Sequence, residues 1–317
     1  MHRSFFCNAQ AGTSGVWETD LSLQYLRVFG YIDAVARAGS IRKAAEALFI
    51  TPSALDRRVQ DLEKELGAAL FERHARGMRL TAAGELFVHH VRAQRADFGR
   101  IQTEIEHLKG MRRGTVSIAA SQALSFSVLP DLINRMGAAN PGIDFRVRIC
   151  DRQAVVLALR AFEADLGLVY SMQPAADLTV LMQVEQRLCA VMAAGHSLAA
   201  KAAVRMRDCL RYPLAMPDAT LGARALLDGF FAHSSLKPEV ALESNSFELL
   251  RNFVRSNDAV SFQIQVGTPL GRDQDGVTAR VIEERAFPRQ PLTVAQLKGR
   301  HLPQPALRFL AALRDTL

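Results

Sequence analysis

Residues 51–67 constrain the fold of this chain more than any other stretch, because they carry the signals for both ends of one helix. Thr51 is a favoured N-cap residue, Pro52 lacks an amide that the first helical turn would leave unbonded, and Gly67 suits a helix end. The apolar residues between these signals recur at steps of four, three and four: Leu55, Val59, Leu62 and Leu66. This spacing predicts a helix over residues 52–66 with one buried face.

The residues on either side predict another helix before this one and a hairpin after it. Ser40 can cap the earlier helix, whose small apolar side chains let a second helix approach closely, and residues 49–50 close the turn. Residues 70–80 contain apolar anchors, several arginines, and Gly77 at the point of reversal. Residues 21–38 have apolar side chains on one helical face and would support the other helices. We therefore expect a winged helix-turn-helix over residues 21–80.

The polar side of this helix and the basic hairpin carry side chains suited to DNA. Short polar groups and a guanidinium near a helix N-terminus match base edges in a major groove, and wing arginines match phosphates. The carboxylate of Asp56 either accepts from a cytosine amino group or pairs with Arg57 or Gln60. Arg42 and Lys43 either contact phosphate or lie on a solvated helix face. The predicted DNA-binding set is Arg42, Lys43, Thr51, Pro52, Ser53, Asp56, Arg57, Gln60, Arg73, Arg76 and Arg79.

A long linker helix is predicted over residues 81–110, with Thr81 as its cap. Apolar side chains recur along it at steps of four and three, which is a heptad seam sustained for three repeats. The stripe could pack on the chain's own C-terminal domain, but we favour self-association because the helix is too long for its small neighbour to cover. Two paired recognition helices then require an inverted repeat in the DNA. The predicted dimerisation set is Phe87, Val91, Gln94, Phe98, Ile101, Ile105 and Leu108.

Residues 111–317 are predicted to form a separate domain of two α/β lobes. The periodicity changes from helical to alternating after residues 110–114, and the order of elements up to residue 170 predicts a βαβαβ unit with a parallel sheet. We expect lobe I to cover about 114–184 and 265–317, and lobe II about 185–264. This arrangement resembles the type 2 periplasmic-binding proteins.

An effector site is expected where the strands of the two lobes end. Open parallel sheets bind ligands beyond the carboxyl ends of their strands, and hydroxyl and N–H groups at helix N-termini favour an anion such as a carboxylate. Ser121 and Ser246 would face such a cleft, although each could instead be an ordinary helix cap. The predicted effector-binding set is Ser121, Gln122, Arg148, Ser244, Asn245, Ser246 and Gln263.

The stretch AGSIRKAAEALFITPSALDRRVQDLEKELGAALFERHARGMRLTAAG, residues 38–84, resembles the DNA-binding signature of bacterial LysR-type transcriptional regulators in identity, spacing and order. Arg57 matches an arginine that recurs in this family. Two positions depart from the usual pattern. Residues 51–53 read Thr-Pro-Ser where Ser-Gln-Pro or Ser-Pro is usual, and Asp56 stands where the family generally has serine.

The resemblance implies a fold and a function. The fold is a winged helix-turn-helix, a long dimerising helix and a two-lobed effector-binding domain, and the function is sequence-specific regulation of transcription under control of a small molecule. The implied partners are double-stranded DNA with an inverted-repeat operator, an effector that is often an organic acid or aromatic compound, a second copy in a dimer or tetramer, and RNA polymerase. The resemblance implies no cofactor and a cytoplasmic protein.

Charge and motifs limit the other classes of function. The net charge of +7 favours polyanionic partners, yet residues 1–110 hold fifteen Lys/Arg against thirteen Asp/Glu, so DNA binding must depend on local placement of arginines. The chain has no G-x-S-x-G, P-loop, G-x-G-x-x-G or HExxH motif, so we do not expect an enzyme. The alternative is a two-lobed small-molecule-binding protein or an enzyme without a transcriptional role.

Membrane and redox functions also lack clear signals. No apolar run approaches the length of a membrane span, and residues 1–20 resemble a disordered extension more than a signal peptide. The four cysteines have neither CxxC spacing nor histidines at metal-ligand intervals: Cys7, Cys150, Cys189 and Cys209. We expect free thiols and no metal site, with a redox pair of Cys189 and Cys209 as the less favoured alternative.

Overall fold

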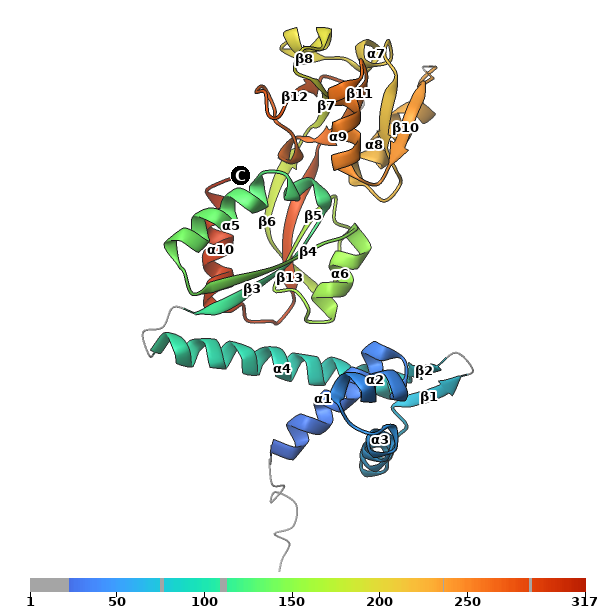
Figure 1. The fold of residues 1–317 in the computed structure, drawn as a ribbon, viewed down its shortest axis with the longest axis vertical. Helices are drawn as coiled ribbons and strands as arrows, with labels where there is room; N and C mark the ends of the chain where they lie inside the picture. The colour runs from blue at the N-terminus through green and yellow to red at the C-terminus, as the bar shows by residue number, and fades with distance from the viewer. Residues whose placement is uncertain (1–22, 75–76, 109–112, 236, 285–286) are drawn as a thin grey trace, which may run out of the picture. The chain divides into compact units, whose positions relative to one another are not determined.

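The computed structural model describes residues 23–74, 77–108, 113–235, 237–284 and 287–317, and it divides into two compact units, residues 1–92 and 93–317 (Figure 1). The division falls inside the long helix α4. The predicted N-terminal extension, residues 1–20, lies outside the described residues.

The first unit contains three helices, a two-stranded hairpin and the beginning of α4. Its elements are α1 (Leu23–Ala38), α2 (Ile41–Leu48), α3 (Pro52–Leu66), β1 (Phe71–His74), β2 (Gly77–Leu80) and α4 (Ala82–Leu108). The caps are those that the sequence predicts, because Ser40 Oγ accepts from Lys43 N and Thr51 Oγ1 accepts from Ala54 N. The predicted winged helix-turn-helix is therefore confirmed.

One core holds these elements together. Leu55, Val59 and Leu62 of α3 are buried in it together with side chains of α1, α2 and the hairpin. The fourth predicted position was wrong, because Leu66 is 45% exposed. Leu66 is the last residue of α3, and the chain turns away at Gly67.

In the second unit, lobe I is a five-stranded sheet with helices on both faces. Its strands, in spatial order, are β4 (Ile143–Ile149), β3 (Gly114–Ala120), β5 (Leu166–Tyr170), β13 (Gln290–Leu297) and β6 (Leu178–Gln186). Its helices are η1 (Gln122–Ser125), α5 (Val128–Ala139), α6 (Arg152–Arg160) and α10 (Gln304–Arg314). Helices α5 and α10 cover one face of this sheet and α6 covers the other (Figure 1). Val116, Ile118 and Ala120 belong to the core beneath α5 and α10, and Ala119 belongs to the core beneath α6, as the two-residue period of a strand requires.

Lobe II is a six-stranded mixed sheet. Its strands, in spatial order, are β10 (Val240–Ser244), β9 (Leu214–Pro217), β11 (Val260–Ile264), β7 (Leu188–Ala193), β12 (Val277–Ile282) and β8 (Ala203–Val204). The helices are η2 (Ser197–Ala200), α7 (Met206–Cys209), α8 (Gly222–Ala232), α9 (Phe247–Ser256) and η3 (Gln265–Gly267). The predicted pair of α/β lobes is therefore confirmed.

The predicted return to lobe I at residue 265 was wrong. β12 pairs with β7 and β8 of lobe II, so the chain crosses back only between Ile282 and Gln290. The first crossing lies between β6 and β7, at Arg187, close to its predicted place. Alternation predicts that residues 277–282 form a strand, but it does not say which sheet will pair with that strand.

Candidate nucleic-acid interface and ligand cleft

Helix α3 turns one side to the core and the other to solvent. Ser53, Arg57 and Gln60 are exposed, as are the capping residues Thr51 and Pro52 at the start of the helix. The Arg57 side chain is 85% exposed, and its nearest acidic partner is Asp61, with 3.9 Å between Arg57 Nε and Asp61 Oδ2. A contact of that length in water holds a guanidinium weakly, so Arg57 is available to a ligand.

Asp56 is tied to two neighbouring side chains. Its Oδ2 accepts from Gln60 Nε2 at 3.0 Å, and its Oδ1 accepts from Arg73 Nη2 of the hairpin at 2.6 Å. This arrangement agrees with the predicted intrahelical pairing with Gln60. The partner in the hairpin was not predicted from the sequence, because Arg73 lies seventeen residues away.

The hairpin forms a wing that is fastened to the turn before α2. Met78 N donates to Gly39 O at 2.8 Å, and a Cβ at Gly77 would lie 2.4 Å from that same oxygen. Gly77 also has φ +129°, so only glycine fits this close approach without strain. Arg73 and Arg79 are exposed on the wing, while Arg76 lies outside the described residues.

Arg42 and Lys43 are exposed on α2. Arg42 Nε lies 3.2 Å from Glu46 Oε1 one turn later, and both side chains are well exposed. Ion pairs of this kind are common on solvated helix faces. Because such a pair is weak, Arg42 could exchange Glu46 for a phosphate.

The predicted dimerisation seam divides into two parts along α4. Phe87 packs on the core of the first unit and meets Phe29 edge to face, with 5.5 Å between ring centroids. Val91 has no exposed surface in the single chain, so its prediction as a contact between two copies was wrong. Phe98, Ile101 and Ile105 are 51%, 44% and 45% exposed, and Gln94 is exposed as well. The side chain of Leu108 lies outside the described set.

The two lobes of the second unit meet where the predicted effector residues lie. Gln122 Oε1 of lobe I accepts from Phe247 N, the first residue of α9 in lobe II, at 2.9 Å. Ser121 precedes η1, but its side chain makes no capping hydrogen bond, and its Oγ is buried without a partner among the described residues. Ser121 therefore does not act as an ordinary helix cap.

The residues before α9 behave differently. Ser246 Oγ accepts from Leu249 N at 3.2 Å, and Ser244 Oγ accepts from Ser246 N at 3.0 Å. These serines act as a helix cap and a turn, which was the alternative interpretation of Ser246. Asn245 is exposed beside them.

Two further predicted residues have contrasting places. Gln263 of β11 is 2% exposed and accepts from Arg251 Nη2 through its Oε1 at 3.3 Å. Arg148 does not join the cleft residues, because it lies on the edge strand β4, where its Nη1 donates to Glu163 Oε2 at 2.8 Å. A hollow on the α6 side of lobe I is lined by both of these side chains.

Three residues that the sequence did not single out stand at the junction of the lobes: Phe126, Tyr170 and Arg251. The Arg251 guanidinium carbon lies 3.0 Å from the Phe126 ring centroid. The Tyr170 ring lies against the start of α8, since a Cβ at Gly222 would come within 2.8 Å of it. The hydroxyl of Tyr170 is buried, and burial raises its pKa to about 12. The sequence held one signal for Arg251, a charged residue one helical turn after the buried Phe247.

The described cysteines are free thiols. Burial raises the pKa of Cys189 and of Cys209 to about 12, so both remain protonated at neutral pH. Cys7 lies outside the described residues.

Comparisons with known proteins follow the same division of the chain. A family model described as "Bacterial regulatory helix-turn-helix protein, lysR family" matches residues 26–85, and one described as "LysR substrate binding domain" matches residues 109–317. A probable RuBisCO transcriptional regulator of Cyanophora paradoxa is 27% identical over 253 residues, which cover 78% of this chain and 77% of that protein.

Solved structures show the same fold. Full-length OxyR from Pseudomonas aeruginosa is 21% identical with a TM-score of 0.67, and the match covers 91% of this chain and 94% of that one. Full-length CbnR in complex with its target DNA is 20% identical with a TM-score of 0.60, and the match covers 92% of this chain and 99% of that one. Among the described residues, no helix has the length and apolar character needed to cross a membrane.

Proposed function

Because the chain belongs to the family of LysR-type transcriptional regulators, we propose which of its residues carry out that function. The protein is a DNA-binding transcriptional regulator with a domain that binds a small molecule. In our proposal, α3 and the wing contact an inverted-repeat operator, and the exposed stripe of α4 joins two copies. A small organic anion between the lobes controls the assembly.

The observation that carries the DNA contact is the orientation of α3. Leu55, Val59 and Leu62 fasten the helix to the core, and this leaves Ser53, Arg57 and Gln60 facing outward from its first three turns. A guanidinium can bind the O6 and N7 atoms of guanine bidentately, and an amide can bind adenine in the same way. We assign base contacts to these three side chains.

We propose that groups around that helix contact phosphates. Arg73 and Arg79 of the wing are exposed, and Thr51 lies at an exposed helix N-terminus, where backbone N–H groups favour an anion. We assign Arg42, Lys43 and Pro52 to the same backbone-facing rim, and we extend the wing to Arg76. Asp56 then orients Arg73 and Gln60 and does not itself contact a base.

The oligomer is proposed from the exposed half of the seam. Phe98, Ile101 and Ile105 recur at steps of three and four, and each leaves nearly half of its surface in water. A second α4 laid against them would bury that surface and would place two recognition helices on one duplex. Gln94 would favour one register of the pair at some expense of stability.

The effector is proposed to bind at the junction of the lobes, beside Ser121, Gln122 and Gln263. An effector can shift the protein only if it binds one arrangement of the lobes more tightly than another. That shift would alter the orientation of the paired DNA-binding units, and with it promoter bending or contact with RNA polymerase. A protein with these partners acts in the cytoplasm and needs no catalytic residue.

The test is binding of the purified full-length protein to the DNA upstream of its own gene. Fluorescence anisotropy would be measured with that duplex and with a duplex of shuffled sequence, at several salt concentrations. We expect specific binding to exceed non-specific binding by about a thousandfold or more at physiological salt, and both to weaken as salt rises. Equal affinity for the two duplexes would reject sequence-specific regulation at that site.

A further inference from the structure

Arg251 is a partly buried cation, and among the described residues no carboxylate lies at ion-pair distance from it. Its Nη2 donates to the carbonyl of Gly267 and to Gln263 Oε1, while its Nε is buried without any hydrogen-bond partner among the described residues. The face of the guanidinium lies on the Phe126 ring. Burial lowers the pKa of Arg251 to about 10, so the group keeps its charge at neutral pH.

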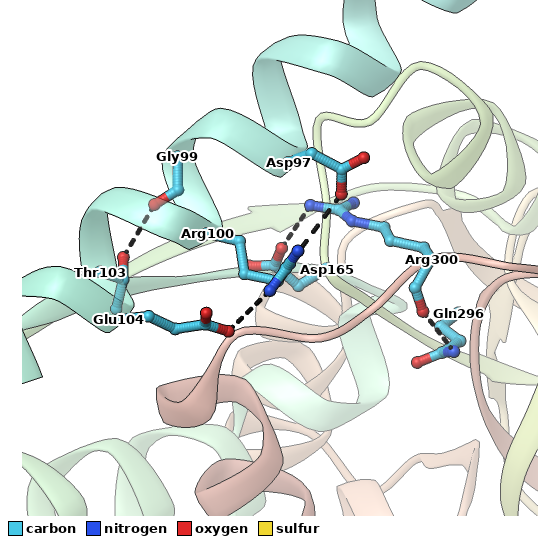
Figure 2. Close-up of polar contacts among 8 residues, drawn as sticks. All are labelled: Asp97, Gly99, Arg100, Thr103, Glu104, Asp165, Gln296 and Arg300. Carbon is cyan, nitrogen blue, oxygen red and sulfur yellow. Dashed lines mark hydrogen bonds and ion pairs between the residues drawn. The ribbon is translucent and has the colours of Figure 1, made fainter.

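Four other arginines of low exposure are paired with acids. Arg92 lies 2.7 Å from Asp33, Arg224 lies 2.7 Å from Asp228, and Arg300 lies 2.5 Å from Asp165 (Figure 2 draws the last pair). Arg100 has Glu104 at 2.7 Å (Figure 2). A buried charge is unfavourable unless it is paired. Among the described residues, Arg251 has no carboxylate at ion-pair distance, and Asp275 acts on it only from farther away.

Arg280 shows that the absence of an acid alone does not make a site. It too has no carboxylate partner among the described residues, but its guanidinium donates to the carbonyls of Lys201, Ala199 and Ala279 and to the hydroxyl of Thr278. Arg251 differs because part of its donor capacity is unused inside the protein.

The unused groups near Arg251 are all able to donate. Gln263 is 2% exposed, and because its Oε1 accepts from Arg251, its Nε2 is a donor that is left without a partner. Ser121 Oγ and the Tyr170 hydroxyl are also buried and unpartnered, and they lie at the ends of the neighbouring parallel strands β3 and β5. Two N–H donors without partners and two hydroxyl groups that can also donate suit a ligand with several lone pairs.

Two lobes meet at this place. Phe126 and Ser121 belong to lobe I, whereas Arg251 and Gln263 belong to lobe II. η1 of lobe I packs on η3, which contains Gly267, because a Cβ at Gly267 would lie 2.8 Å from Ala123 O. The guanidinium therefore forms part of the contact between the lobes.

We propose that Arg251 binds the carboxylate of the effector and serves as an internal occupant of the site until the effector arrives. The guanidinium leaves the Gly267 carbonyl and the Phe126 ring and donates to the ligand's carboxylate instead. The carboxylate also accepts from Gln263 Nε2 and Ser121 Oγ. Binding thereby exchanges a contact between the lobes for a contact with the ligand. This inference rests on the proposed function, since it names the effector's chemical class and the residue that recognises it.

The test uses acetate as the smallest carboxylate probe and acetamide as its neutral counterpart. The melting temperature of the full-length protein would be followed as each is added, with sodium chloride keeping the ionic strength constant. We expect a saturable rise with acetate and none with acetamide, because a ligand that binds only the folded state stabilises it. An equal response to both probes, or no response to acetate, would overturn the proposal.

Matched variants locate the binding. Arg251→Gln should weaken acetate binding by about tenfold or more, because a charge-assisted bond is lost. Arg255→Gln removes the same charge from an exposed position on the same helix and should change nothing. Phe126→Leu removes the competing ring and should tighten acetate binding. Unchanged affinity in Arg251→Gln, or an equal loss in Arg255→Gln, would refute the role of Arg251.

Operator binding by the same proteins separates the two proposals. Arg251→Gln should still bind its operator duplex in the absence of acetate, which also shows that it folds. If the wild-type protein binds acetate but no operator, the proposed function fails and the anion site stands. If it binds the operator but acetate binding does not depend on Arg251, this inference alone fails.

Discussion

A single carboxylate joins two parts of the proposed DNA-binding surface. Asp56 accepts from Gln60 on its own helix and from Arg73 on the wing, so its negative charge is matched before DNA arrives. The pairing also limits the rotamers of both partners, which lowers the entropy that they lose on binding. An acid that phosphate would repel therefore orients two residues that we propose contact DNA.

Arg57 is the residue on which sequence discrimination should depend most. Replacing it with alanine removes an exposed guanidinium that makes no close contact in the free protein, so folding should be unaffected. Specific affinity should fall by about 1–3 kcal/mol, as expected for one bidentate base contact. The measurement is anisotropy with the operator duplex and with duplexes changed at one base pair each.

Arg58→Ala is the matched control for that variant. Arg58 is the next residue and is also exposed, but it points to a different side of the helix. It should change affinity for all sequences slightly and equally. If Arg57→Ala keeps the wild-type preference among the changed duplexes, Arg57 does not recognise a base.

Residue-level prediction from the sequence succeeded where contacts are local. The caps Ser40 and Thr51 and the buried stripe up to Leu62 depend on neighbours within one or two helical turns. Leu66 failed because periodicity does not say where the core beneath a helix ends. Arg251 could not be assigned, since its partners come from η1, β11 and η3, and nothing local brings these together.

At the scale of elements, α4 changes its environment along its length. The same heptad pattern covers the whole helix, but its first turns pack on the DNA-binding core, whereas Phe98 and Ile101 remain exposed. Periodicity reports that a face is apolar and does not report what covers it. The alternative in which the stripe packs on its own chain holds for Val91, which has no exposed surface.

Two glycines on α4 provide a paired test of this change. A Cβ at Gly84 would lie 2.0 Å from the Leu70 carbonyl oxygen, whereas a Cβ at Gly99 would meet nothing within 4 Å. Gly84→Ala should destabilise the DNA-binding unit by roughly 1–3 kcal/mol through overpacking. Gly99→Ala should stabilise the helix by about 0.5–1 kcal/mol, since alanine is the better helix former. Urea unfolding of both variants gives the two signs, and a shift of the same sign in both would contradict the placement of α4.

The exposed stripe is tested by introducing charge into it. Phe98→Glu combined with Ile101→Glu should dissociate the oligomer, because negative charges from the two copies would meet in the seam between them. Leu86→Glu is the control, since Leu86 is 75% exposed on the same helix but lies outside the heptad positions. Multi-angle light scattering would measure the mass of each variant. An intact oligomer in the double variant would show that copies associate elsewhere.

The order of strands in lobe II shows the limit of prediction at this scale. The sequence predicts that residues 277–282 form a strand, but this strand pairs with β7 and β8, and Val281 pairs with Cys189, which lies 92 positions earlier in the chain. The prediction that Arg148 binds the effector was wrong for a similar reason. Its partner Glu163 comes fifteen residues later in the chain, after α6. Local pattern gives the elements, and the assignment of each element to a lobe needs the long-range contacts.

At the scale of the whole molecule, net charge alone does not explain DNA binding. The chain carries a net charge of +7, yet residues 1–110, which contain the DNA-binding unit, have only two more basic than acidic residues. Attraction to the phosphate backbone must then come from a few arginines. The acidic side chains near these arginines point elsewhere or already contact another group. Arg79 is such a group, because it is exposed on β2 and Glu72, the residue opposite it in the hairpin, has its Oε2 3.2 Å from His74 Nε2.

Salt dependence measures how many of these groups meet phosphates. The logarithm of the binding constant should fall linearly with the logarithm of salt concentration, and Arg79→Gln should reduce the slope by about one for each copy that contacts DNA. Affinity should fall by a similar factor for operator and shuffled duplexes, because a phosphate contact carries no sequence information. This combination distinguishes Arg79 from Arg57, whose loss should change the ranking of sequences.

Arg211→Gln provides the matched change in net charge. Arg211 is exposed in the effector-binding domain, and its side chain forms no hydrogen bond or ion pair with the described residues. If attraction to DNA followed the net charge of the whole chain, both variants would lower the slope equally. If it follows local placement, Arg211→Gln should leave the slope unchanged while Arg79→Gln lowers it. If the salt slope is the same in the two variants, Arg79 makes no phosphate contact of its own. The electrostatic attraction would then come from outside the wing, and Arg79 would not belong to the DNA-binding surface.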